Sequence, residues 1–320
     1  MRLFQKTNID FMGKRKLWFS ISLSVIFIGL ISLTFKGIGF GIDFLGGTEV
    51  VVQFPNAPQI SEIRAAMNKA GFERAEIKEY GFASRMLIRT PEQGSGTTIG
   101  DKMITSLTAA FPSNIPQVLA EQKIGPKIGK ELRANALYAI AASLIAIMIY
   151  VGIRFKFIYG IGAVVALFHD VLVTLGIISI VNGLTPFTNF EIDQNMIAAL
   201  LTLVGLSVND TVVIFDRIRE NQKIHRSMNL FDVMNKSLNE TLSRTIITSG
   251  TVFAVVVILF LFGGEVNRGF GFAMTIGIIT GTYSSIYIAS AIVLEYVNRK
   301  LAGSKETLGL KAQKVGELVK

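Results

Sequence analysis

Cysteine is absent from this 320-residue chain, and histidine occurs only twice. Without cysteine the chain forms no disulfide bond, no thiolate nucleophile and no thiolate metal site. The two histidines, His169 and His225, lie on opposite sides of a predicted span boundary, so their spacing does not indicate a metal site. A Walker-type glycine-rich loop is also missing, which excludes ATP as the energy source of this chain. We therefore expect no enzymatic activity, no metal and no cofactor.

Long apolar runs, in contrast, are abundant. Half of the residues (50%) are hydrophobic, and the mean hydropathy of +0.50 is unusual for a soluble protein of this length. A helix crosses the hydrocarbon core of a bilayer with roughly 20 mostly apolar residues. The stretches that meet this requirement are Leu17–Phe35, Asn135–Ile153, Ile158–Val181, Met196–Phe215, Ile246–Phe262 and Phe270–Leu294. The sequence thus predicts a polytopic α-helical membrane protein with six transmembrane helices.

The basic residues follow a topological pattern, although the formal net charge of +9 alone could suggest nucleic-acid binding. Lys and Arg gather in residues 1–16, at Arg154 and Lys156, in residues 216–245 and in the tail 295–320, whereas residues 182–195 contain neither. The positive-inside rule then predicts a membrane protein with both termini cytoplasmic. We attribute the charge to topology and contact with the lipid bilayer, and expect no nucleic-acid partner. The first apolar run lacks a small-x-small cleavage site, so we expect it to remain as a span.

The segment 36–134, between the first two spans, is less apolar and reads as one small domain on the outer, periplasmic side. Its patterns predict the order strand, helix, strand, strand, helix, strand. The expected elements are Glu49–Phe54, Gln59–Ala70, Ala75–Tyr80, Arg85–Thr90, Thr98–Phe111 and Gln117–Ile124. This order indicates a ferredoxin-like α+β domain. The segment contains neither His nor Cys, which favours binding over chemistry.

Asp210 is an unusual residue because it lies inside the fourth predicted span. A charged side chain at membrane depth costs about 2.5–3.5 kcal/mol on insertion scales, so its presence needs a physical reason. Three hypotheses remain open: a proton or ion carrier, a static ion pair, and a carboxylate close enough to the headgroups to hydrate. Arg244 precedes the fifth span on the same side and has the length to reach Asp210. Pairing with Arg lowers the pKa of a carboxyl and burial raises it, so a small movement can change its protonation.

The third predicted span contains two further ionisable residues, His169 and Asp170. Both should face the protein interior, either as a hydrogen-bonded structural pair or as part of a proton relay. Asn209 is a polar neighbour for Asp210 or for a helix backbone. In the last span, small residues recur every four positions, at Gly277, Gly281, Ser285 and Ala289. This stripe indicates close helix packing, within the bundle or between subunits.

Four motifs in order along the chain resemble those of a known family. They are "GIDFLGGTEV" after the first span, "ALFHDV" in the third, "VNDTVVIFDRIREN" at the end of the fourth, and "LNETLSRTIITSGT" leading into the fifth. These segments resemble the SecF proteins of the SecD/SecF family, protein-export subunits within the resistance-nodulation-division superfamily. The resemblance extends over nearly the whole chain.

This resemblance implies a function that composition does not. SecD would be the partner that completes a twelve-span unit, which would assist the SecYEG channel and, indirectly, SecA. The unit would use protons as the coupling ion to draw unfolded preprotein outward. The family's membrane carboxylate and arginine correspond to Asp210 and Arg244 here, and Asp43, Gly46 and Gly47 of the first motif would be structural. Two alternatives remain: a static scaffold that holds SecD and the channel together, and a small-molecule or lipid exporter of the same superfamily.

Overall fold

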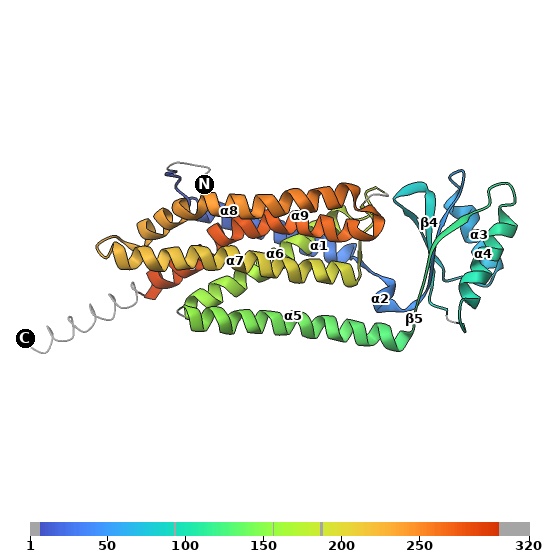
Figure 1. Ribbon diagram of the computed structural model, residues 1–320, viewed down its shortest axis with the longest axis horizontal. Coiled ribbons are helices and arrows are strands. Elements are labelled where there is room, and N and C mark those ends of the chain that lie inside the picture. The colour runs from blue at the N-terminus through green and yellow to red at the C-terminus, as the bar shows by residue number, and fades with distance from the viewer. Residues whose placement is uncertain (1–6, 93, 156, 186–187, 301–320) are drawn as a thin grey trace, which may run out of the picture.

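The structure is a computed structural model that describes residues 7–92, 94–155, 157–185 and 188–300. Residues 1–6 and 301–320 of the two predicted cytoplasmic termini, and Lys156, lie outside these ranges. A bundle of long helices forms most of the molecule, and a smaller domain of strands and helices is attached to one end (Figure 1). We refer to this end of the bundle as the domain end and to the opposite end as the distal end.

The bundle confirms the expectation of six helices that are long and apolar enough to span a membrane. They are α1 (Arg15–Phe35), α5 (Pro126–Arg154), α6 (Phe157–Val181), α7 (Gln194–Ile224), α8 (Leu230–Phe262) and a last helix built from α9 (Gly264–Ser284) and the π-helical turn η2 (Ser285–Ala289). The helix of α9 and η2 continues to Lys300. Several helices are longer than their predicted apolar segments because polar turns extend them beyond the lipid-matched length.

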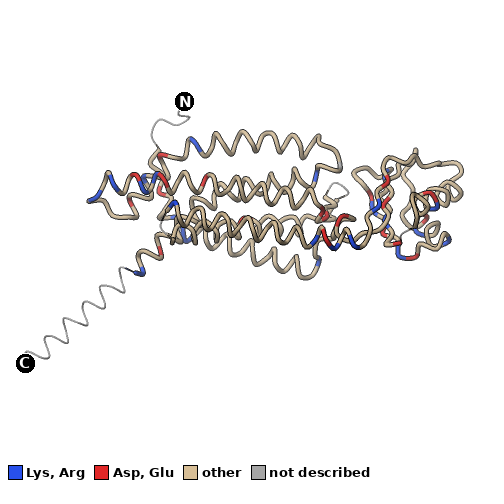
Figure 2. The backbone as a smooth tube through the Cα atoms, turned by 60° about the horizontal axis from the view of Figure 1, so that its bottom comes forward, with Lys and Arg blue, Asp and Glu red and all other residues tan. Residues whose placement is uncertain are grey.

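The helices divide into a central and a peripheral group. In the most apolar window of each span, 72% of the residues of the last helix are buried, against 6% in α5. Helices α6 and α7 are also largely buried, whereas α1 and α8 resemble α5. Charged residues concentrate at the two ends of the bundle and in the attached domain, with few between (Figure 2). The peripheral helices therefore present apolar side chains outward, as lipid or a membrane partner requires.

Close packing inside the bundle depends on small residues. Gly29 of α1 and Gly176 of α6 face each other, and a Cβ on Gly29 would lie 2.7 Å from the Gly176 Cα. In the last helix, a Cβ on Gly277 would meet the Leu203 side chain of α7, and one on Gly281 would meet Ser207. The predicted stripe of small residues thus serves internal packing at these two positions, and not a seam between subunits.

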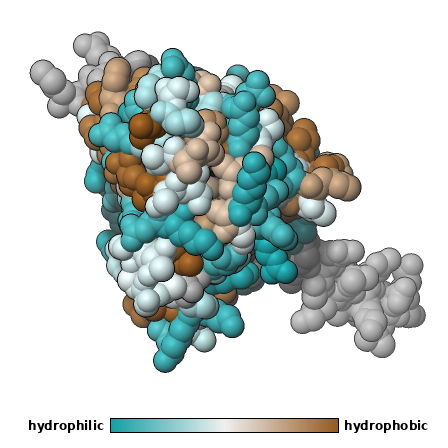
Figure 3. All heavy atoms as spheres, turned by 90° about the vertical axis from the view of Figure 1, so that its right-hand side faces the viewer, coloured by the Kyte–Doolittle hydropathy of each residue, from teal (hydrophilic) through white to brown (hydrophobic). Residues whose placement is uncertain are grey.

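The attached domain contains an antiparallel four-stranded sheet in the order β3–β4–β2–β5. Its elements are β2 (Gly47–Gln53), α3 (Ile60–Lys69), β3 (Glu76–Tyr80), β4 (Phe82–Thr90), α4 (Thr98–Ala110) and β5 (Gln117–Ile124). Their order along the chain agrees with the predicted order. One sheet face packs apolar side chains against α3 and α4, while the other faces the bundle. Seen from the domain end, the molecule is largely hydrophilic (Figure 3).

Two short connections join the domain to the bundle, and the sequence analysis did not predict either. A two-residue strand β1 (Gly39–Phe40) pairs in parallel with β6 (Glu191–Ile192), which lies between α6 and α7. A single-turn helix α2 (Ile42–Leu45) follows β1 and packs against the start of α5. Helix α5 itself runs without a break from the end of β5 into the bundle.

Candidate functional site

Asp210 lies in the middle of the bundle, on the buried face of α7. Its side chain is 7% exposed and accepts a hydrogen bond of 2.7 Å from Ser249 Oγ of α8. A cavity of about 70 Å³ adjoins it. The cavity is lined by Leu203, Leu206, Ser207, Asn209, Asp210, Thr248, Ser249, Val252, Gly277, Ile278, Gly281 and Thr282. This volume is large enough for a few water molecules, and both hydroxyl and carboxylate groups border it.

Arg244 does not pair with Asp210, contrary to the static ion-pair hypothesis. Within the described part of the chain, neither a hydrogen bond nor an ion pair joins these two side chains. The reason is geometric: α8 begins well before Arg244, at Leu230, and the exposed Arg244 side chain lines a separate cavity at the distal end. This distal cavity has a volume of about 990 Å³ and is bordered by charged residues of α7 and α8, including Asp216 and Glu240.

About one helical turn separates the two cavities. Thr248 lines the Asp210 cavity and donates a hydrogen bond of 2.9 Å to the carbonyl oxygen of Arg244, one turn earlier on α8. On α7, Asp210 and Val213 line the inner and the distal cavity, respectively. A turn of α-helix rises about 5.4 Å. The Arg244 side chain therefore lies at the boundary between the enclosed carboxylate and the wider distal space.

His169 and Asp170 are joined to each other and to two neighbouring helices. His169 Nδ1 lies 3.0 Å from Asp170 Oδ1, and Ser207 Oγ of α7 donates a hydrogen bond of 2.6 Å to Asp170 Oδ2. On its other side, His169 Nε2 lies 3.1 Å from the Tyr283 hydroxyl of α9. The Tyr283 hydroxyl is in turn 3.2 Å from Ser22 Oγ of α1. The two residues thus face the interior, as predicted.

The remaining predicted polar residues divide between the cavity and the helix backbone. Asn209 lines the Asp210 cavity but is exposed. Thr202 and Thr211 each donate to a carbonyl of their own helix, four residues earlier. Sequence reasoning did not select Ser249, Tyr283 or Ser22, because hydroxyls in apolar helices commonly bond to their own backbone and no local pattern distinguishes them.

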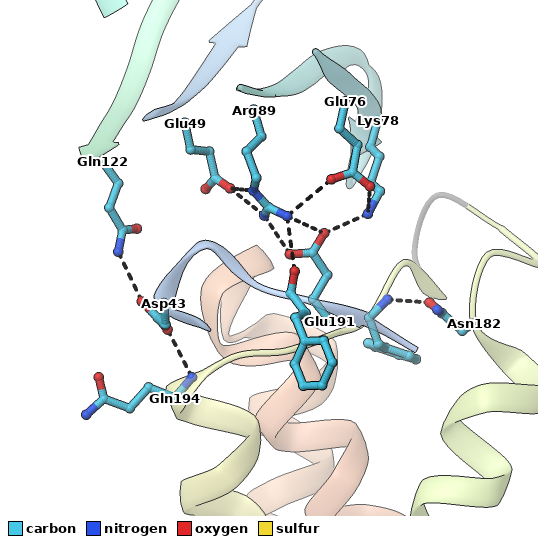
Figure 4. A network of polar contacts seen from close by, with 11 residues as sticks. Asp43, Glu49, Glu76, Lys78, Arg89, Gln122, Asn182, Glu191 and Gln194 are labelled. Atoms are coloured by element: carbon cyan, nitrogen blue, oxygen red, sulfur yellow. Dashed lines mark hydrogen bonds and ion pairs between the residues drawn. The ribbon is translucent and has the colours of Figure 1, made fainter. Parts of the chain in front are cut away.

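The first motif builds the junction between domain and bundle (Figure 4). Asp43 accepts hydrogen bonds from the Gln194 backbone amide, at 2.9 Å, and from the Gln122 side chain, at 3.3 Å. Gly46 and Gly47 follow with φ angles of +73° and +128°. A Cβ on Gly47 would overlap the Thr90 carbonyl oxygen. Both glycines are required by backbone geometry, because side chains disfavour these φ values.

Arg89 of β4 forms the centre of a buried charge cluster at the same junction (Figure 4). Its guanidinium pairs with Glu49 of β2 at 2.5 Å and with Glu191 of β6 at 2.6 Å. Lys78 of β3 reaches Glu191 at 2.7 Å and Glu76 at 2.6 Å. Glu191 belongs to the loop between α6 and α7, so this cluster, which we call the junction clasp, ties three strands of the domain to the bundle.

The acidic groups of the junction respond differently to their burial. Burial disfavours the charged form of Glu191, but hydrogen bonds and attraction from Arg89 and Lys78 outweigh it and lower the pKa of Glu191. For Glu49, burial outweighs the attraction of Arg89 and raises the pKa. Asp193, the N-cap of α7, has a pKa raised to about 6 by burial and by repulsion from Asp43 and Glu191, against the hydrogen bond from the Met196 amide.

The fold and the site together define a class: a multi-pass helical membrane protein with a buried, hydrogen-bonded carboxylate and an α+β domain attached through a charged junction. Residues 103–299 match the family model of the C-terminal part of the protein export membrane proteins SecD and SecF, and residues 31–54 match the SecD/SecF GG motif. The chain belongs to this family, and within it to the SecF subunits of the protein translocase.

Similar proteins support this assignment over almost the full length. The protein translocase subunit SecF of Rhodothermus marinus is 45% identical, covering 94% of this chain and 97% of the relative. That of Thermodesulfovibrio yellowstonii is 42% identical, covering 92% and 96%. Among solved structures, SecDF of Thermus thermophilus, described as a translocon-associated membrane protein, has a TM-score of 0.81 and 33% identity. The match covers 91% of this chain but only 39% of that longer chain, and SecD is accordingly the partner indicated for this subunit.

Proposed function

We propose that this SecF subunit, together with SecD, couples the movement of protons across the inner membrane to the export of preprotein. The observation that carries the proposal is the position of Asp210: a buried carboxylate on a small cavity, one helical turn from a larger distal cavity that Arg244 lines. In this arrangement Asp210 holds a proton while Arg244 is away, and releases it when the guanidinium approaches. Each proton that crosses supplies about 2.3 kcal/mol per 100 mV of membrane potential.

The proposed topology follows from the charge distribution. The distal end is cytoplasmic, because the basic residues of the α7–α8 connection and of the helix ends lie there (Figure 2). The attached domain is then periplasmic. Its antiparallel sheet order and its strand and helix sequence support a ferredoxin-like domain. The domain acts by binding, and we propose no enzymatic role for it.

Two connections suit the transfer of bundle movement to this domain. Helix α5 passes from the end of β5 into the bundle as one rigid element. The junction clasp, through Glu191, ties the sheet to the loop between α6 and α7. A shift of α7 relative to α5 would therefore tilt the sheet. We propose that this tilt acts on preprotein that leaves the SecYEG channel, to which SecA delivers it on the cytoplasmic side.

The substitution Asp210→Asn tests the proposal, because it removes the titratable proton and preserves size. We expect gradient-dependent stimulation of export by the SecD–SecF complex to disappear, while abundance and co-purification with SecD stay normal. Thr202→Val is the matched control, since Thr202 lies exposed on the same helix and borders neither cavity, and this variant should export normally. If Asp210→Asn leaves export unchanged, the subunit is a scaffold.

A further inference from the structure

The second buried carboxylate of the bundle, Asp170, has no part in the function proposed above. It is 1% exposed and thus more deeply buried than Asp210. Within the described residues, no Lys or Arg contacts it, and its partners are His169 and Ser207. A carboxylate at this depth without a cationic partner is costly, which favours a role that depends on its proton.

Ser207 connects Asp170 to the cavity of Asp210. Its hydroxyl donates to Asp170 Oδ2 at 2.6 Å, and the same residue lines the 70 Å³ cavity, one turn of α7 before Asp210. Gly281 leaves the space for this contact, since a Cβ there would lie 3.2 Å from Ser207 Oγ and 3.5 Å from Asp170 Oδ2. Asp210 and Ser207 thus border the same cavity, and Ser207 bonds directly to Asp170.

Around Asp170, the polar contacts are complete in both protonation states of the carboxyl group. With Asp170 ionised, Ser207 donates to Oδ2 and His169 Nδ1–H donates to Oδ1, while His169 Nε2 accepts from the Tyr283 hydroxyl, which accepts from Ser22. With Asp170 protonated on Oδ2, this oxygen donates to Ser207 Oγ, and Oδ1 still accepts from His169 Nδ1–H. Every group has a partner in both arrangements, so neither protonation state of Asp170 leaves a buried polar atom without a hydrogen bond.

We propose that Asp170 is a second proton-binding site of this subunit, which exchanges protons with Asp210 through Ser207. The inference rests on the proposed function of Asp210. In the transfer, Asp210 gives its proton to water in the cavity, that water protonates Ser207 Oγ, and the Ser207 hydroxyl proton passes to Asp170. Asp210 ends as a carboxylate and Asp170 as a carboxylic acid, with water and Ser207 restored. The proton arrives on Asp170 Oδ2, and His169 keeps its own proton on Nδ1. His169 still reports the event, because its Nδ1–H donates to a charged carboxylate before the transfer and to a neutral carboxyl group after it.

The titratable groups around this site limit what can respond to pH. They are His169 on α6, Asp210 across the cavity on α7 and Tyr283 on α9, while α1 contributes Ser22 and α8 contributes Ser249. The chain contains only one other histidine, His225. In a His225→Gln background, ¹⁵N-histidine labelling of the full chain in bilayers therefore reports on His169 alone.

The experiment is a pH titration of the His169 Nδ1–H signal by solid-state NMR. We expect the wild-type Nδ1 proton signal to move upfield as the pH falls, because protonation of Asp170 replaces a charged acceptor by a neutral one, and Asp170→Asn to abolish the change. Tyr283→Phe is a control that keeps the Asp170–His169 contact and should retain a pH-dependent change. An unchanged Nδ1–H signal across the whole pH range in the folded wild-type chain would overturn the proposal, because a carboxyl group that binds a proton changes the acceptor of this hydrogen bond.

The link through Ser207 has its own readout in proteoliposomes that contain the complex with SecD. Ser207→Ala should lower the gradient-driven proton flux about ten-fold or more, the effect of one hydrogen bond to a charged group. Thr211→Val is the matched control, because Thr211 bonds only to its own helix backbone. If Asp210→Asn stops the flux but Ser207→Ala does not, the link is wrong and the proposed function stands. If Asp210→Asn has no effect, the proposed function fails, while the titration of the His169 Nδ1–H signal still decides whether Asp170 binds a proton.

Discussion

The junction clasp makes a quantitative prediction about how the domain is held on the bundle. Glu191→Gln removes one charge from the cluster, but Arg89 retains Glu49 at 2.5 Å and Glu76 at 3.3 Å, so its guanidinium keeps two carboxylate partners. The loss then amounts to charged hydrogen bonds, about 1.5–3 kcal/mol. Arg89→Met is more severe, because it leaves Glu49 and Glu191 buried without their main partner. For a broken buried pair the expected loss is about 3–5 kcal/mol.

The asymmetry between the two substitutions is what the assay must resolve. The chain has no cysteine, so a single pair of introduced cysteines carries spin labels without background. Thr105→Cys on α4 and Leu184→Cys in the loop after α6 are both exposed and lie on opposite sides of the clasp. Their distance distribution should be narrow in the parent chain, broader in Glu191→Gln, and broadest in Arg89→Met. Thermal unfolding in detergent should rank the three proteins in the same order.

A matched control separates loss of the clasp from loss of surface charge. Arg217 and Glu220 form an exposed pair within α7, and Glu220→Gln should change stability by less than about 1 kcal/mol. If Glu191→Gln leaves both the distance distribution and the unfolding temperature as they were, the cluster does not hold the domain. The proposed route from bundle to domain would then depend on α5 alone.

Three further predictions concern the junction and the packing of the bundle. In the folded protein the pKa of Asp193 is raised from 3.8 to about 6, so its contribution to stability is present at low pH and disappears as the pH rises through that window. Asp193→Asn keeps an N-cap acceptor and should remove up to about 3 kcal/mol of this pH dependence, which makes it the more stable form at neutral pH. Unfolding curves at several pH values test this. Gly47→Ala, at φ +128°, should cost about 3 kcal/mol or more, whereas Gly125→Ala, with open space around it, should be nearly neutral in the same unfolding assay. Gly29→Ala should separate α1 from α6 and destabilise the protein by about 1–3 kcal/mol. Gly205→Ala is the control, because its added methyl group meets nothing within 4 Å. Equal melting temperatures for the two variants would contradict the close contact between α1 and α6.

Sequence patterns predicted the elements that carry a long or regular signal. All six spans and the six main elements of the domain appear close to their predicted positions, because apolar runs and periodicities extend over many residues. The pairing of β1 with β6 was beyond such reasoning, since two residues are too few for a period and their partner strand lies about 150 positions away along the chain. The helical continuations of α7 and α8 beyond the lipid were missed for a related reason: hydropathy marks the membrane, and not the end of a helix.

The site illustrates the difference between predicting a residue and predicting its partner. The cost of burying charge was enough to select Asp210, His169 and Asp170 from sequence, and the structure buries all three. The same reasoning paired Asp210 with Arg244 because both lie near the same membrane boundary. It could not weigh the rotation of α8, which directs Ser249 toward Asp210 and Arg244 toward the distal cavity.

That separation is itself informative about coupling. A carboxylate permanently paired with Arg would stay ionised and carry no proton, whereas one bonded to uncharged hydroxyl groups can hold a proton in a membrane interior. In the cycle proposed above, the present arrangement, in which Arg244 lies one turn away and lines the distal cavity, corresponds to the proton-holding half. The complementary half requires α8 to turn or slide so that Arg244 replaces Ser249 at Asp210. Because α8 also packs along α9, whose Gly281 borders Ser207 and Asp170, such a movement would change the space around both carboxylates at once.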